Sequence, residues 1–144
     1  MITDPQATPE FSIVVPVFQN VENLPELFSR LLDIQFALSD KIEVLFVVDG
    51  SPDNSLAVLL NSKSQLPFQS VVIELSRNFG SFAAIRVGIE HSTAPYLAVM
   101  SADLQEPPEL LVEIFHELKH GDADVVVGQR TGRQDGKLRD LLSN

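Results

Sequence analysis

The chain has 144 residues and 44% hydrophobic content, which is typical of one domain with a single buried core. Its formal net charge of −10 argues against nucleic-acid binding, which requires clustered Lys and Arg, and the absence of cysteine excludes disulfides and thiolate metal sites. No apolar run approaches the roughly 18 residues needed to cross a bilayer, and residues 1–10 do not resemble a signal peptide, so we expect this chain to be soluble.

Predicted strands and helices alternate along the chain. Short β-branched runs predict strands buried on both faces, whereas apolar residues spaced three and four apart predict amphipathic helices. The predicted strands are residues 11–16, 42–48, 70–75, 96–100 and 124–128. The predicted helices are residues 22–36, a segment that ends near Ser62, 81–91 and 107–120. This alternation is typical of a doubly wound, mostly parallel α/β sheet, for which right-handed crossovers give the strand order 3-2-1-4.

Polar residues follow the carboxyl ends of the first four predicted strands. Because the strands of a parallel sheet end at one edge, the loops that carry Asn20, Asp49, Arg77 and Asp103 should meet there. The crevice at the switch in strand order should open between the loops of Asn20 and Asp103, with Asp49 beside them. The sequence therefore predicts one ligand-binding crevice.

The loop at residues 101–108 has the clearest chemical pattern. Asp103 and Gln105 lie between an apolar strand and two prolines, Pro107 and Pro108, that can begin a helix. An oxygen-rich loop in this position suits a hard divalent cation that holds a phosphate. A plain turn or cap at Asp103 is the simpler interpretation, but the three other polar loops favour a ligand site.

Asp49 and Arg77 each have two interpretations. Asp49 begins a run of turn-forming residues, so it can belong to a plain turn in which Ser51 or Asp53 caps the next helix. A carboxylate at a sheet edge can also accept hydrogen bonds from a base or a ribose hydroxyl. Arg77 can contact a phosphate or pair with an acidic neighbour.

Residues 116–120 match the zinc-protease pattern HExxH, but their position on the predicted helix argues against a metal site. Leu111 and Phe115 share the apolar face, whereas His116 and His120 lie on the opposite face. No histidine follows as a third ligand, so we expect two surface histidines. The chain also lacks GxGxxG and GxxxxGK[ST], the patterns of dinucleotide and NTP sites.

Five short motifs follow one another in the loops and in the last predicted strand. They are Val15-Pro16-Val17-Phe18-Gln19-Asn20, Val48-Asp49-Gly50-Ser51-Pro52-Asp53, Leu75-Ser76-Arg77-Asn78-Phe79-Gly80, Ala102-Asp103-Leu104-Gln105-Glu106-Pro107-Pro108, and residues 126–130. Together, in this order, they resemble the N-terminal part of family 2 glycosyltransferases, whose GT-A fold has a Rossmann-like nucleotide-binding half. The resemblance covers residues 11–130 and is strongest to the polyprenyl-phosphate branch, the dolichyl-phosphate mannosyltransferase-like enzymes.

The resemblance implies a nucleotide site made by residues from these loops. Pro16 and Asn20 would border the nucleotide, Asp49 would contact its base or ribose, and Arg77 would help to shape the pocket. Ser101 occupies a position that in the family contributes to the same site.

The resemblance also implies a metal and a reaction. Asp103 and Gln105 would hold Mg²⁺ or Mn²⁺ that bridges the diphosphate and neutralises the leaving group as a Lewis acid. In the family the acceptor attacks the anomeric carbon directly, with inversion. The donor would be a UDP- or GDP-linked sugar, and the acceptor a lipid phosphate or a glycan. The sequence names neither the sugar nor a catalytic base.

Two departures from the family pattern keep other functions open. The family usually has aspartate at the positions of Val48 and Ser101, and each loss removes a carboxylate from the nucleotide and metal site. Ser101 retains a hydroxyl that can form a hydrogen bond but carries no charge. There are two alternatives: a non-catalytic nucleotide-sugar-binding module with a degenerate DxD site, and an interaction domain on the same fold.

We expect three segments: a flexible tail at residues 1–10, the nucleotide-sugar-binding domain at 11–130, and a polar basic segment at 131–144. Family members continue with an acceptor-side region, and this branch commonly adds membrane segments. We therefore expect this chain to be an inactive fragment of an enzyme on the cytoplasmic side of a membrane. Basic residues such as Arg133 and Lys137 would suit a lipid phosphate or an anionic bilayer. Homo-oligomerisation is left open.

Overall fold

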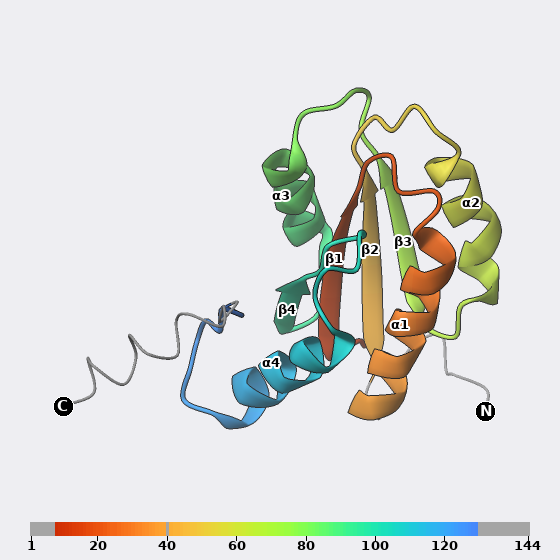
Figure 1. Cartoon of the computed structure of the whole chain (residues 1–144). Coiled ribbons are helices and arrows are strands. Elements are labelled where there is room, and N and C mark those ends of the chain that lie inside the picture. The colour runs from red at the N-terminus through yellow and green to blue at the C-terminus, as the bar shows by residue number, and fades with distance from the viewer. Residues whose placement is uncertain (1–7, 40, 130–144) are drawn as a thin grey trace, which may run out of the picture.

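The computed structural model describes residues 8–39 and 41–129 and contains a four-stranded parallel sheet (Figure 1). The strands are β1 (Phe11–Val17), β2 (Ile42–Val48), β3 (Gln69–Glu74) and β4 (Tyr96–Val99). Their order in the sheet is β3-β2-β1-β4, and all three pairings are parallel. The predicted fold class and strand order are confirmed.

Helices cover both faces of the sheet, as a doubly wound fold requires (Figure 1). They are α1 (Leu24–Leu38), α2 (Ser55–Ser62), α3 (Ser81–His91) and α4 (Pro108–His120), with a short 3₁₀ helix, η1 (Lys63–Gln65), after α2. The larger core cluster joins one face of the sheet to α1, α2 and α4. A smaller cluster, built on Val14, Leu45, Val47 and Ala84, lies beneath α3 on the other face. Burial from both sides explains why β2 is apolar at nearly every position.

Helix α3 lies unusually close to β1 because Gly88 has no side chain. A β-carbon at Gly88 would lie 2.3 Å from Cγ1 of Val14. This glycine therefore serves close helix–sheet packing.

The register of β1 creates an opening at the carboxyl edge of the sheet. The carbonyl of Val14 accepts a hydrogen bond from Met100 N on the β4 side, and that of Val17 accepts one from Asp49 N on the β2 side. The backbone groups of successive residues in a strand point to opposite sides, so those of Pro16 point toward β4. Proline has no N–H to donate there. Since β4 ends opposite Val14, the sheet opens beside Pro16.

The described residues cover the two predicted end segments only in part. Of the predicted tail at residues 1–10, residues 1–7 lie outside the described part of the chain. Pro9 is buried, and Glu10 Oε1 lies 2.7 Å from Lys119 Nζ, so the ordered domain begins before Phe11. The predicted basic segment at 131–144 lies wholly outside the described residues.

The predicted fifth strand at residues 124–128 is wrong. Within the described part of the chain this segment has no strand pairing, and Val125 and Val127 are 77% and 79% exposed. A cavity of about 490 Å³ separates it from β4. A β-branched sequence forms a strand only where a neighbouring strand completes its backbone hydrogen bonds, and here that neighbour is out of reach.

Helix α4 has the orientation that its sequence predicts. Leu111 and Phe115 are buried, whereas His116 and His120 are exposed with ring centroids 4.8 Å apart. Among the described residues there is no group of three or more His, Cys, Asp or Glu that could hold a metal ion. None of the helices in residues 8–39 and 41–129 is long and apolar enough to cross a membrane.

Candidate functional site

A cleft of about 320 Å³ opens at the carboxyl edge of the sheet, beside Pro16; we call it the sheet-edge cleft. It brings together five predicted nucleotide-binding residues, Pro16, Asn20, Asp49, Ser101 and Asp103. The other predicted residues, Arg77 and the metal ligand Gln105, do not line it. Loops that follow all four strands meet here, so the predicted convergence at one edge is confirmed.

Asp49 is almost completely buried and holds a neighbouring loop in place. Its exposed fraction is 2%. Oδ1 accepts a hydrogen bond from Phe79 N at 2.8 Å, and Oδ2 accepts one from Gly80 N at 2.9 Å. Two backbone donors on one carboxylate are strong, charge-assisted bonds that fix the loop after β3. A contact between Asp49 and a base or ribose stays a prediction.

Gly50 allows the same two loops to approach each other. Its φ is +61°, and a β-carbon there would lie 2.4 Å from both the Arg77 carbonyl carbon and Asn78 N. Any side chain at this position would push the loop after β2 away from the loop after β3, because backbone atoms cannot move aside as the end of a flexible side chain can.

Ser51 and Asp53 connect the loop after β2 to the loop after β1. Ser51 Oγ accepts a hydrogen bond from Gln19 N at 2.8 Å, and Asp53 Oδ2 accepts one from Val21 N at 3.1 Å. Asp53 Oδ1 also accepts bonds from Ser51 Oγ and from Ser55 N at the start of α2. The N-cap of α2 is Asn54, which makes no side-chain cap bond, so neither Ser51 nor Asp53 is the N-cap that the sequence suggested. Residues 49–53, which we call the Asp49 loop, bind the loops on both sides.

The charge of Asp53 is stabilised by these donors. Partial burial acts to raise its pKa, but the hydrogen bonds from Ser51, Ser55 and Val21 outweigh it and lower the pKa from 3.8 to about 2. Asp53 is therefore an ionised, structural carboxylate over the whole physiological range. It acts as an acceptor within the scaffold.

Asp103 lies in a tight turn at the mouth of the cleft. Its Oδ1 accepts hydrogen bonds from Ser101 Oγ at 2.6 Å and from Gln105 N at 3.2 Å. Leu104 has a φ of +62°, which turns the chain sharply between Asp103 and Gln105. The side chain remains exposed at the cleft, so the predicted metal ligand is both oriented and accessible.

The guanidinium of Arg77 stacks on a neighbouring aromatic ring. Its guanidinium carbon lies 4.3 Å from the centroid of the Phe79 ring, a cation–π arrangement. Both side chains are exposed beside the cleft, although only their neighbours Asn78 and Gly80 line it. Stacking on Phe79 limits the directions in which the guanidinium can point.

The sequence model described as Glycosyl transferase family 2 matches residues 12–143. The chain belongs to this family. The match spans every loop that forms the sheet-edge cleft, and the family resemblance carried by the five motifs is confirmed.

Curated relatives lead to the same family. The undecaprenyl-phosphate 4-deoxy-4-formamido-L-arabinose transferase of Sodalis glossinidius is 38% identical over 142 residues, which cover 99% of this chain and 43% of that protein. An uncharacterized glycosyltransferase of Synechocystis is 38% identical over 127 residues, 88% of this chain and 39% of its own length. The chain thus spans about two fifths of the length of these family 2 relatives. The first relative agrees with the polyprenyl-phosphate branch inferred from the motifs.

Solved structures of similar shape include S. aureus TarS residues 1–349 in complex with UDP-GlcNAc, with a TM-score of 0.68 and 20% identity. The alignment covers 86% of this chain and 37% of TarS. The mannosyltransferase PcManGT from Pyrobaculum calidifontis, in complex with GDP-Man and Mn²⁺, has a TM-score of 0.71 and 18% identity, over 96% and 40% of the two chains. At these identities the likeness shows the shared GT-A fold alone.

The residues of this family 2 chain fit a divalent cation with one charged ligand. Mg²⁺ is usually bound through one or two carboxylates together with substrate phosphates and water. Asp103 and Gln105 are both exposed in the same turn and offer one carboxylate and one amide oxygen. Ser101, where the family carries a carboxylate, is instead a donor to Asp103. The donor set fits a cation that a diphosphate would complete.

Sequence reasoning missed six residues that line the cleft: Val17, Phe18, Asn78, Gly80, Ser81 and Ala102. Gly80 has a φ of +97° and directly precedes α3, so the glycine before a predicted helix was the signal that pointed to this turn. Phe18 and Asn78 belong to the motifs, but no role was predicted for either. Their contribution comes from the folding of the loops and had no pattern of its own.

Proposed function

We propose that this chain is the donor-binding part of an inverting glycosyltransferase, which transfers a sugar from UDP or GDP to polyprenyl phosphate or a glycan. The observation that supports this proposal is the sheet-edge cleft, which brings Asp103 together with the loop of Pro16 and Asn20. Family membership supports the reaction class, and the relative from Sodalis glossinidius, named as an undecaprenyl-phosphate transferase, supports a lipid-phosphate acceptor.

In this proposal the cleft takes the nucleoside diphosphate. Pro16 and Asn20 border the base and ribose, while Asp49 holds the loop that carries Arg77 and Asn78. Asn20 is itself held, since its Oδ1 accepts a hydrogen bond from Phe18 N at 2.9 Å. The site is thus preorganised by bonds within the chain, so little ordering is needed when a nucleotide binds.

Asp103 and Gln105 hold Mg²⁺ or Mn²⁺ in the proposal. The bound cation supplies Lewis-acid neutralisation of the diphosphate leaving group. The hydroxyl of Ser101 and the backbone N–H of Gln105 both donate to Oδ1 of Asp103, which fixes the carboxylate that would hold the cation. No residue of this chain is assigned as a catalytic base, and a phosphate acceptor needs none because it is already ionised.

Calorimetric titration of UDP and GDP, with Mn²⁺ and with a chelator, tests the donor site. We expect metal-dependent binding that Asp103→Asn weakens by about 10- to 150-fold, since a charge-assisted contact contributes about 1.5–3 kcal/mol. Ser101→Asp should tighten Mn²⁺-dependent binding by adding a carboxylate. Glu117→Gln, an exposed carboxylate on α4, is the control and should change nothing. If Asp103→Asn binds as the parent does and the chelator has no effect, the metal assignment is wrong.

The second candidate is a non-catalytic nucleotide-sugar-binding module. The observation that favours it is Ser101, whose hydroxyl replaces a carboxylate of the family pattern. Full-length protein, in vesicles with undecaprenyl phosphate and a labelled nucleotide sugar, decides between the two. Transfer to the lipid supports the enzyme, and binding without transfer supports the module. Turnover by residues 1–144 alone would contradict our expectation that the acceptor side lies elsewhere in the protein.

A further inference from the structure

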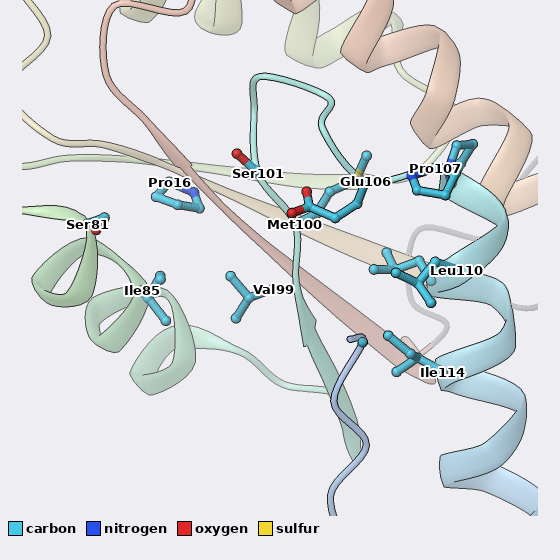
Figure 2. A pocket seen from close by; sticks show the side chains of 13 residues that line it. Pro16, Ser81, Ile85, Val99, Met100, Ser101, Glu106, Pro107, Leu110 and Ile114 are labelled. Atoms are coloured by element: carbon cyan, nitrogen blue, oxygen red, sulfur yellow. The ribbon is translucent and has the colours of Figure 1, made fainter. Parts of the chain in front are cut away.

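A second pocket, of about 370 Å³, adjoins the sheet-edge cleft; we call it the side pocket (Figure 2). The two share Pro16, Ser81 and Ser101 as wall residues. Beyond this shared wall the surroundings become apolar, with Ile85 of α3 on one side and Leu110 of α4 on the other (Figure 2). A ligand in the cleft can therefore continue into the side pocket past Ser101.

Glu106 is the one charged residue among the described residues that line the side pocket. Figure 2 shows its carboxylate between the end of β4 and the start of α4, near Met100. The Oε2 atom is cut off from solvent, and within residues 8–39 and 41–129 it has no hydrogen-bond donor.

This arrangement is costly and sets Glu106 apart from the other carboxylates of the site. Asp49, Asp53 and Asp103 each accept at least two hydrogen bonds. A carboxylate oxygen without water or a donor loses its solvation with no compensation. Groups of this kind in a pocket wall point to a donor that a ligand supplies.

We propose that the side pocket takes the sugar ring of the donor, and that Glu106 accepts a hydrogen bond from a hydroxyl or amide N–H of that sugar. The inference rests on the proposed function, because the sugar is attached to the diphosphate in the adjoining cleft. A rotation of the carboxylate about its last torsion presents either oxygen to the pocket. Glu106 is then a specificity-determining residue for the donor.

The chemistry of the pocket favours a sugar over the acceptor's phosphate. A sugar is uncharged, its C–H faces suit walls such as Ile85 and Leu110, and its hydroxyls need a few well-placed acceptors. A phosphate beside Glu106 would instead meet a like charge in surroundings of low polarity, which is strongly unfavourable. The lipid phosphate must therefore approach from another side.

The test compares each nucleotide sugar with its own nucleotide. Affinities of UDP-glucose, UDP-GlcNAc and GDP-mannose are measured by calorimetry with Mn²⁺ beside those of UDP and GDP, for the parent chain and for Glu106→Ala. We expect UDP and GDP to bind Glu106→Ala within about 2-fold of the parent, because the nucleotide does not reach the side pocket. The nucleotide sugar that the parent binds best should weaken by about 10- to 150-fold. Glu106→Gln keeps one acceptor oxygen and should lose only about 5-fold.

Glu109→Ala is the matched control. Glu109 is an exposed carboxylate in the first turn of α4, so it shares with Glu106 any electrostatic effect on the helix N-terminus. Unlike Glu106, it does not line the side pocket. We expect it to leave every affinity unchanged. Equal losses in Glu106→Ala and Glu109→Ala would overturn the proposal, because helix electrostatics would then explain both.

The outcomes separate this inference from the proposed function. The sugar assignment is refuted, while the donor cleft stands, in either of two cases. In the first, Glu106→Ala leaves the affinities for all three nucleotide sugars unchanged relative to those for UDP and GDP. In the second, it weakens the binding of nucleotides and nucleotide sugars equally. If the parent binds neither nucleotides nor nucleotide sugars, the proposed function fails and the inference fails with it.

Discussion

Replacing Asp49 by asparagine should destabilise the protein even when no nucleotide is present. The carboxylate is 2% exposed, and its two oxygens accept bonds from Phe79 N and Gly80 N. Asparagine keeps one acceptor oxygen and turns an NH₂ group toward the other N–H, so two donors face each other. The substitution removes one bond to a charged group and makes the second a neutral one.

The size of the effect follows from these two bonds. Losing a bond to a charged group costs about 1.5–3 kcal/mol, and converting another to a neutral bond costs about 1 kcal/mol. Removing a buried charge offsets part of this loss. We expect Asp49→Asn to lower the free energy of unfolding by about 2–4 kcal/mol, a large share of the roughly 5–15 kcal/mol typical of a domain.

Urea unfolding followed by circular dichroism, in buffer without nucleotide or metal, measures this loss. Asp33→Asn on α1 is the control, because Asp33 is an exposed aspartate and should change stability by less than about 0.5 kcal/mol. A loss below about 0.5 kcal/mol in Asp49→Asn, together with a collapse of nucleotide affinity, would refute the reasoning. Asp49 would then act on the ligand and not on the loop.

Two further predictions concern the scaffold. Because the pKa of Asp53 is lowered from 3.8 to about 2, its stabilising contribution is complete above about pH 4 and disappears as the pH falls toward 2. The stability difference between the parent and Asp53→Asn, from urea unfolding, should therefore shrink between pH 4 and pH 2, and a constant difference would contradict the assignment. Gly88→Ala should cost about 1–3 kcal/mol by forcing α3 away from Val14, seen as a lower Tm. An unchanged Tm would mean that the helix shifts freely.

The strand order was predictable because it depends on features of single segments. Apolar runs located β1 and β2, and right-handed crossovers left few ways to arrange four parallel strands. The fifth strand failed for the opposite reason. Residues 124–128 have strand-forming side chains, but pairing depends on a neighbouring strand that the local sequence does not reveal.

The candidate site was predictable as a place but not as a set of contacts. That Asn20, Asp49 and Asp103 meet follows from the parallel sheet alone. The partners of Asp49 are 30 and 31 residues away in sequence, and no local pattern identifies them. The environment of Glu106 is equally hidden, because its buried Oε2 atom without a donor arises only after β4 and α4 have packed.

The Asp49 loop binds its neighbours through their backbone and not through their side chains. Its four acceptor contacts on the flanking loops go to the N–H groups of Gln19, Val21, Phe79 and Gly80. Every amino acid except proline offers that donor. Side chains at Phe18, Gln19 and Phe79 can therefore be exchanged without loosening the framework that presents them. Such a framework lets the exposed side chains of these loops change while the backbone around the cleft keeps its shape.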